Sequence, residues 1–186
     1  MPALITDQEF EAITESLEAG DYDNCTFLQC NFEKADFFKF SFTDCTFIEC
    51  NLTNANIAET AFKTARFEDC KLLGLHFEHC NPFLLSLHFE RCQLDLAVFY
   101  QLELKGTQFL QCSAHETDFT EANLAGASFA NSSLKGALFD QCNLEKADFR
   151  NASGFNIHPR HNKLKGARFS PDGLAGLLAH TGIVVD

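Results

Sequence analysis

Large apolar residues recur at every fifth position through most of the chain. In "ANLAGASFANSSLKGALF", residues 122–139, each large residue follows a small one by two places. A helix buries residues at a period near 3.6 and a strand at a period of 2, so a period of five fits neither alone. The first register contains Tyr22, Phe27, Phe32, Phe37, Phe42, Phe47, Leu52, Ile57, Phe62, Phe67, Leu72 and Phe77.

A second register continues from Phe89 to Phe149 and returns at Leu164 and Phe169 after a break at "GFNIHPRHN". A short fixed period indicates a solenoid, because each unit is too small to bury its own apolar side. Four five-residue sides would form a 20-residue coil. Residues 20 apart match once two additional residues near 81–86, in "CNPFLLSL", are treated as a bulge. The predicted core ladder then consists of Phe27, Phe47, Phe67, Phe89, Phe109, Phe129, Phe149 and Phe169.

The runs "ANLAGASF", "CNLEKADF" and "CTFIECNL" resemble the A(D/N)LXX consensus of pentapeptide repeat proteins. The resemblance covers about residues 21–169 and implies an all-β solenoid, a right-handed quadrilateral β-helix with a short C-terminal helix and tail. We expect seven to eight coils, about 35 Å long at about 4.8 Å per coil. A loop is expected near 154–162. Residues 1–20 are expected to cap the first coil, either as a helix, since Thr6 and Glu9 have capping-box spacing, or as a strand.

The nine cysteines all occupy the small position of the five-residue unit. We interpret them as reduced packing residues, because parallel stacked side chains lack disulfide geometry and zinc-type CxxC spacing is absent. His76, Glu78 and His79 could hold a metal, but polar residues alternating on an exposed wall are the favoured interpretation. We therefore predict neither a metal nor a cofactor.

Composition restricts the possible functions. The formal net charge of -12 argues against direct binding to nucleic acid or to anionic membranes, since phosphate contacts need Lys and Arg. No stretch approaches the roughly 20 apolar residues of a membrane span and no signal-peptide pattern opens the chain, so we expect a cytoplasmic protein. No G-x-S-x-G, phosphate-binding glycine loop or HExxH motif occurs. Tight coils also leave little room for a pocket, which favours a non-enzymatic protein.

The negative charge is concentrated. One side of the predicted coil carries six acids against Lys39 alone, and these are the candidate partner-binding residues Asp36, Glu59, Glu78, Asp118, Glu121 and Asp140. The N-terminal segment adds five acids and no base. A solvated acidic wall would serve solubility. A row of negative charge on a rigid rod would also resemble duplex DNA to a basic groove.

The C-terminal segment, residues 170–186, predicts a short helix and an apolar tail. Ser170 is the expected N-cap and Pro171 the first helical residue. The segment would cover the last coil, form a homodimer, or do both. The candidate dimer interface contains Leu174, Leu177, Leu178, Ile183, Val184 and Val185.

"NIHPRHNKLKGARFS" and "GLLAHTGIVV" are similar to the C-terminal region of the Qnr group and of the albicidin and microcin resistance proteins. This resemblance implies a two-fold dimer that binds or protects DNA gyrase and topoisomerase IV by DNA mimicry. Qnr proteins also project loops from their coils, whereas here only the two-residue bulge occurs. The functional hypothesis is therefore a non-enzymatic DNA mimic, and the resemblance implies a link to quinolone resistance. The alternative is a structural or interaction scaffold with no effect on a topoisomerase.

Overall fold

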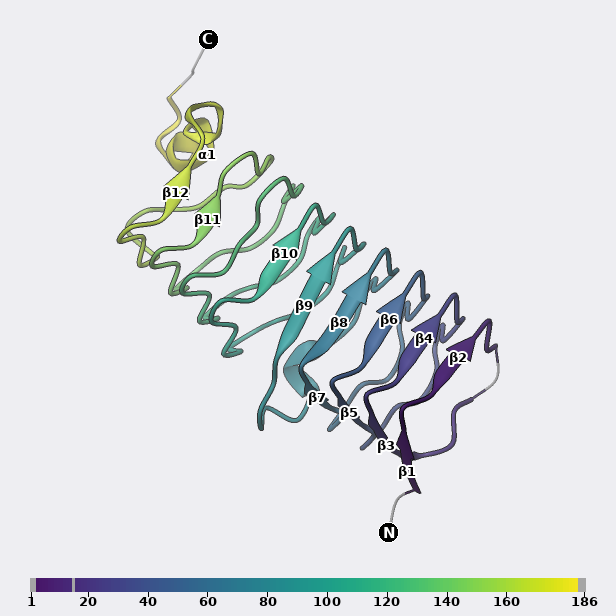
Figure 1. Cartoon of the computed structure of the whole chain (residues 1–186). Helices are drawn as coiled ribbons and strands as arrows, with labels where there is room; N and C mark the ends of the chain where they lie inside the picture. The colour runs from purple at the N-terminus through teal and green to yellow at the C-terminus, as the bar shows by residue number, and fades with distance from the viewer. Residues whose placement is uncertain (1–2, 15, 184–186) are drawn as a thin grey trace.

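The computed structural model describes residues 3–14 and 16–183 and forms a parallel β-solenoid of about eight coils (Figure 1). Within one coil, four inward aromatic rings meet in a closed square, with centroid separations of 5.9, 5.3, 5.6 and 5.8 Å around Phe27, Phe32, Phe37 and Phe42. The predicted quadrilateral β-helix is confirmed.

Short strands mark two of the four sides. The first sheet has the order β1-β3-β5-β7, formed by Ala3–Thr6, Gly20–Asp23, Ser41–Thr43 and Ala61–Lys63. The second has the order β2-β4-β6-β8-β9-β10, formed by Glu9–Glu11, Thr26–Leu28, Thr46–Ile48, Ala65–Glu68, Leu87–Glu90 and Gln108–Leu110. β11 (Asp148–Phe149) pairs with β12 (Arg168–Phe169). Isolated parallel bridges continue the stacking between these elements.

The register follows the predicted spacing. Phe27 pairs with Phe47 and Phe89 with Phe109, both 20 residues apart, whereas Phe67 pairs with Phe89. The two additional residues lie between the bridge from Ala61 to Asn81 and the pairing of Ala65 with Leu87. The 81–86 bulge thus lengthens one corner without shifting the later coils.

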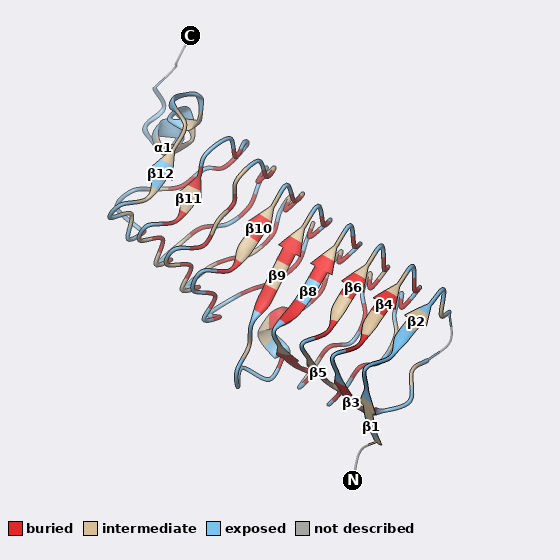
Figure 2. Ribbon diagram, viewed as in Figure 1, coloured by how far each residue is buried: buried red, intermediate tan, exposed pale blue. Residues whose placement is uncertain are grey.

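The phenylalanine ladder fills the centre of the solenoid (Figure 2). Ring centroids of successive members are 4.7 Å apart at Phe27 and Phe47 and 5.4 Å apart across the bulge, at Phe67 and Phe89. Phe10 extends the ladder by one rung, 5.0 Å from Phe27. Each ring therefore stacks on its neighbours above and below, and meets the adjacent sides edge-on.

The N-terminal segment is built of strands. β1 and β2 pair with β3 and β4, with Phe10 opposite Phe27, a spacing of 17 residues instead of 20. Parallel pairing to the first repeat coil satisfies one edge of each strand, which an isolated helical turn at Thr6 could not do.

The last coil is closed by its own chain. Phe155 and Ile157, from the 154–162 loop, are buried, and Phe155 packs 5.7 Å from Phe149 and 5.6 Å from Phe169. The helical turns that follow are η2 (Pro171–Gly173), α1 (Ala175–Leu178) and η3 (Ala179–Thr181). A Cβ on Gly176 would lie 2.4 Å from the Phe155 carbonyl oxygen, so only glycine permits this close approach.

Ser170 occupies the expected N-cap position, but its hydroxyl does not cap the turn. It accepts a hydrogen bond from the Asn151 backbone N–H at 2.9 Å. The expected helix is thus mostly 3-10 turn, with four α-helical residues. In the described part of the chain, no helix has both the length and the apolar character that crossing a bilayer requires.

Candidate partner-binding wall

We use the term acidic wall for the surface that carries Asp36, Glu59, Glu78, Asp118, Glu121 and Asp140. Outward positions stack in a row on this side, where Asp36 bridges Asn56 and Asp118 bridges Val98 and Leu138. The neighbouring corners are joined by backbone hydrogen bonds, from Glu59 N to His79 O and from Glu121 N to Asp140 O, both 2.8 Å. The structure thus places the six carboxylates along one side of the rod.

Two of these carboxylates shape their own corners. Asp36 Oδ1 accepts from Phe38 N at 3.1 Å, and Asp118 Oδ1 accepts from Thr120 N at 2.8 Å. The Asn56 amide also donates to Asp36 from the next coil. Such turns leave one carboxylate oxygen free to face solvent.

Three of the other carboxylates, Glu59, Glu121 and Asp140, have side-chain partners one coil away. Lys39 Nζ lies 3.5 Å from Glu59, and His161 Nδ1 lies 2.9 Å from Asp140. Gln101 donates to Glu121 at 2.7 Å. The charge count by itself missed these contacts, although partners 20 or 21 residues apart follow from the coil period. The acidic wall is therefore negatively charged, and several of its carboxylates are held in place by ion pairs or hydrogen bonds.

A group of histidines lies at the C-terminal end of the acidic wall. The ring of His158 is 4.0 Å from that of His161 and 3.9 Å from that of His180, between centroids. Desolvation, and then the neighbouring His161 and His180, lower the pKa of His158 below its ordinary value. His158 is consequently neutral near pH 7 and adds no positive charge to the wall.

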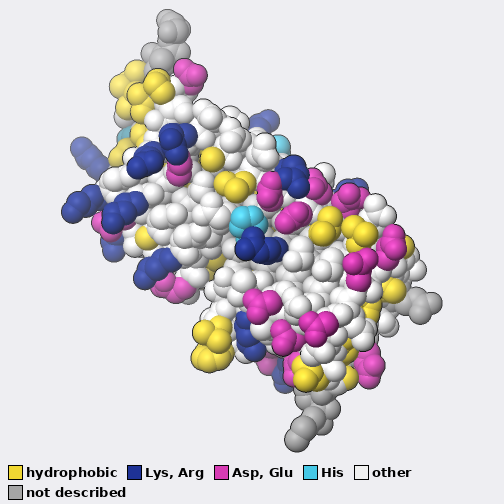
Figure 3. Space-filling model, viewed as in Figure 1, with side chains coloured by type: hydrophobic (Ala, Val, Ile, Leu, Met, Phe, Trp, Pro, Cys, Tyr) yellow, Lys and Arg dark blue, Asp and Glu magenta, His cyan; other side chains and the backbone are white. Residues whose placement is uncertain are grey.

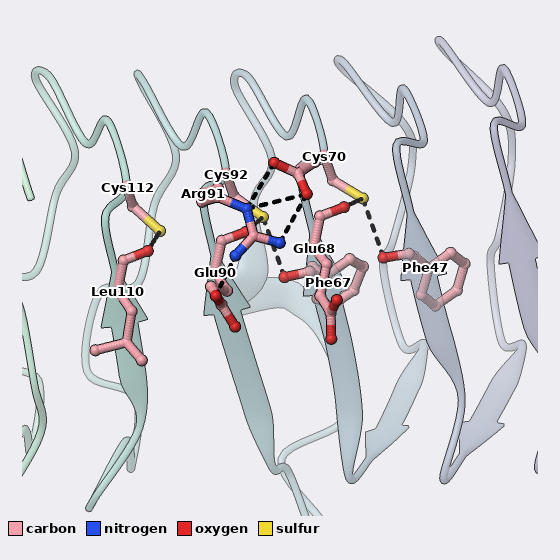
Figure 4. A network of polar contacts seen from close by, with 10 residues as sticks. Phe47, Phe67, Glu68, Cys70, Glu90, Arg91, Cys92, Leu110 and Cys112 are labelled. Atoms are coloured by element: carbon pink, nitrogen blue, oxygen red, sulfur yellow. Dashed lines mark hydrogen bonds and ion pairs between the residues drawn. The ribbon is translucent and has the colours of Figure 1, made fainter.

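The cysteine positions carry a hydrogen-bond ladder that the sequence interpretation missed. All nine thiols are free and buried. Cys70 Sγ donates to Phe47 O at 3.3 Å and Cys92 Sγ donates to Phe67 O at 3.2 Å (Figure 4). Thr60 and Ser132 occupy the same small position on other coils and donate to the equivalent carbonyl at 2.7 Å. The side chain at the small position therefore donates a hydrogen bond as well as fitting the limited space.

Charge on the neighbouring side is largely paired. Arg91 Nη2 donates to Asp69 at 2.8 Å and Arg91 also contacts Glu90 (Figure 4). The guanidinium holds the pKa of the Asp69 carboxyl below its ordinary value. This side therefore offers a partner fewer unpaired carboxylates than its sequence composition indicates.

Positive charge gathers near the C-terminal end, which the assignment of charges to sides had not shown. On the face in Figure 3, Lys and Arg side chains cluster toward that end, whereas Asp and Glu predominate toward the N-terminal half. Among the described residues, no carboxylate pairs with the five exposed bases that we call the basic collar: Lys146, Arg160, Lys163, Lys165 and Arg168.

The residues of the candidate dimer interface differ in their exposure. Leu174, Leu178 and Ile183 are 49%, 38% and 59% exposed. Leu177, in contrast, packs against the core. Val184 and Val185 lie outside the described residues. The alternation of 3-10 and α turns changes the angular spacing, so the three leucines do not share one exposed stripe.

These features define a class of protein, a parallel β-solenoid whose accessible chemistry lies on its outer walls. The pentapeptide repeat region family matches residues 21–83 and 83–158, and the chain belongs to that family. No curated protein sequence matches the chain.

Solved structures of pentapeptide repeat proteins resemble this one. A trypsin-treated variant of QnrB1, a plasmid-mediated fluoroquinolone resistance protein, is 19% identical, with a TM-score of 0.48 and coverage of 100% of this chain and 98% of that one. HetL from Nostoc sp. strain PCC 7120, involved in regulating heterocyst differentiation, is 18% identical, with a TM-score of 0.32 and coverage of 88% and 84%.

Proposed function

We propose that this protein binds a type II topoisomerase, DNA gyrase or topoisomerase IV, through the acidic wall. The observation that carries the proposal is the arrangement of six carboxylates along one side of the rod. A duplex presents regularly spaced phosphates to the enzyme's basic groove, and a rigid row of carboxylates presents the same sign of charge. Binding of this kind is non-enzymatic and would modulate the topoisomerase or protect it from inhibitors.

Two copies would give a longer mimic. The exposed side chains of Leu174, Leu178 and Ile183 form an apolar surface beside the closed end of the solenoid. A two-fold interface there would bury the same patch on both chains and align two rods end to end. We therefore propose a homodimer joined at the C-terminus as the binding species.

The test is a gyrase supercoiling assay with and without a quinolone, together with direct binding measured at several salt concentrations. Replacing Asp118, Glu121 and Asp140 by the corresponding amides removes three charges and preserves side-chain shape. We expect binding about tenfold weaker or more, mainly through slower association, and a shallower dependence on salt.

A matched control removes the same charge from other sides of the coil. Glu103, Glu116 and Glu145 changed to glutamine should leave affinity near that of the unaltered protein. Equal losses in the two triple variants would show that no particular wall is the binding surface. An unaltered protein that neither binds gyrase nor affects supercoiling would disprove the proposed function.

The ion pairs and hydrogen bonds within the acidic wall support the second candidate, a structural or interaction scaffold with no effect on a topoisomerase. Lys39 beside Glu59 and His161 beside Asp140 would stabilise the corners in the absence of any partner. In that case the acid-to-amide variants would change solubility or stability but not supercoiling by gyrase.

A further inference from the structure

Three potential metal ligands converge on one corner of the acidic wall. His76 Nδ1 lies 2.8 Å and His79 Nε2 lies 3.7 Å from the same Glu78 oxygen, Oε1. The two imidazole rings stack with 5.5 Å between centroids. One ligand atom from each of the three residues lies within 4.8 Å of the other two.

An unusual backbone turn brings these residues together. At the equivalent corners before and after it, the residue two places beyond the large one is left-handed, with φ of 56° at Glu59 and 59° at Gln101. Here that residue is His79, the last residue of the 3-10 helix η1, Phe77–His79. This turn has a hydrogen bond that those two corners lack, from His79 N to His76 O at 3.2 Å.

Glu78 is the most shielded member of the group. Its side chain is 16% exposed, whereas those of His76 and His79 are 58% and 63% exposed. Its second oxygen, Oε2, is buried and has no hydrogen-bond partner among the described residues. Burying a carboxylate oxygen without a partner is costly, and a cation on the carboxylate would offset that cost.

We infer that His76, Glu78 and His79 bind a divalent transition-metal ion of the zinc class. Two imidazole nitrogens and one carboxylate are ligands that Zn²⁺ and similar ions accept. Ligand atoms about 2.0–2.1 Å from a tetrahedral ion lie about 3.3 Å from one another. The observed separations of 2.8 and 3.7 Å from Glu78 Oε1 bracket that value, so small side-chain rotations would suffice.

Neither adjacent coil has these three ligands at the equivalent corner. The corresponding positions are Asn56, Ala58 and Glu59 on the preceding coil, and Val98, Tyr100 and Gln101 on the following one. Beside His76 and His79 lies a surface hollow of about 270 Å³, also lined by Asn54, Asn56 and Gly74. The remaining coordination position is therefore accessible to water or to a ligand from another molecule.

The experiment uses the full chain, treated with a chelator, desalted and kept reduced. Zn²⁺ is titrated by calorimetry and Co²⁺ by visible absorption. We expect one ion per chain and a Co²⁺ spectrum without thiolate-to-metal charge transfer, because the nine thiols are buried. Glu78→Gln and His79→Gln should each weaken binding at least about tenfold, since even loss of an outer partner commonly has that effect.

Two histidine variants serve as controls. His88→Gln removes an imidazole on β9 that lies opposite Arg66 and Gln108, and should bind as the unaltered protein does. His161→Gln tests the other histidine group. Loss of binding in His161→Gln but not in Glu78→Gln would place the ion at the C-terminal end and overturn the assignment, as would absence of binding at millimolar Zn²⁺. Circular dichroism of the metal-free variants verifies that each remains folded.

Discussion

Each ring inside the phenylalanine ladder has two stacked neighbours, so its removal leaves a gap that the coils cannot close. Phe109 is fully buried, with ring centroids 5.2 Å from Phe89 and 4.9 Å from Phe129. We expect Phe109→Ala to lower the free energy of unfolding by about 3–5 kcal/mol, measured by denaturant titration. Phe83→Ala, at an exposed position, should change it by no more than about 0.5 kcal/mol. Similar effects in the two variants would contradict the ladder as the main source of stability.

The buried thiols make the fold sensitive to alkaline pH. Burial raises the pKa of Cys45 and Cys142 from 9.0 to about 12. Above pH 9 the unfolded chain releases protons that the folded chain still holds. The contribution of these two thiols to the free energy of unfolding is therefore complete below pH 9 and falls as pH rises toward 12.

The measurement is the free energy of unfolding between pH 8 and about 11. The double variant Cys45→Ala, Cys142→Ala should lose less stability over this range than the unaltered chain, even if it is less stable at neutral pH. Parallel pH profiles would show that these two thiols are not responsible.

The role of the small position was only half visible in the sequence. Cysteine and alanine there correctly predicted a buried site of limited volume. The same position also holds Thr60, Thr117, Ser132 and Asn162, each of which donates to a backbone carbonyl on the coil below. When cysteine, threonine, serine and asparagine all occur at one buried position, a hydrogen-bond acceptor must recur beside it. This mixture of polar residues was the signal in the sequence from which the acceptor could have been predicted.

The strands and turns that could be predicted from the sequence are those in the strict five-residue repeat. The 20-residue spacing predicted which side chains stack, because each side of every coil contributes one inward residue at the same position. The N-terminal segment was ambiguous, since its coil is three residues shorter and Phe10, Ile13 and Leu17 also fit a helical face. Phe155 and Ile157 were assigned to a loop because the last coil is closed by residues outside the period.

The bulge offers a direct test of coil length. Phe83 and Leu84 are exposed, and deleting both would restore a 20-residue coil. We expect the deleted protein to keep its circular dichroism spectrum and nearly its melting temperature, because short exposed loops tolerate deletion. Deleting Ala125 and Gly126 from a regular corner should instead unfold the protein or lower its melting temperature greatly. The opposite ranking would mean that the bulge is needed for folding.

For the complete rod, the apolar surface at one end predicts the oligomeric state. Leu174→Asp with Leu178→Asp places charge on that surface while Leu177 keeps its contact with the core. In multi-angle light scattering at one concentration, we expect dimers of the unaltered chain and monomers of the double variant. Leu138→Asp, at an exposed leucine on the acidic wall, should leave the mass unchanged. A dimer that persists in the double variant would exclude this interface.

Charge along the rod adds a condition to the DNA-mimic proposal. Residues 146–168 contain six bases and one acid, and in a C-terminal dimer these basic collars would lie near the centre. The acidic walls would then flank a positively charged middle. A topoisomerase groove would therefore meet two acidic walls separated by a central band of positive charge.

The N-terminal end of the solenoid has an open edge. β1 and β2 are the terminal strands of their sheets, so among the described residues each pairs on one side only. Unpaired N–H and C=O groups in such a row can pair with the same edge of another copy and join two solenoids end to end. Glu9 and Glu11 are exposed on β2, with Asp7 just before it. Their repulsion by the same residues of a second copy opposes this end-to-end pairing, which gives the N-terminal carboxylates a protective role independent of any partner.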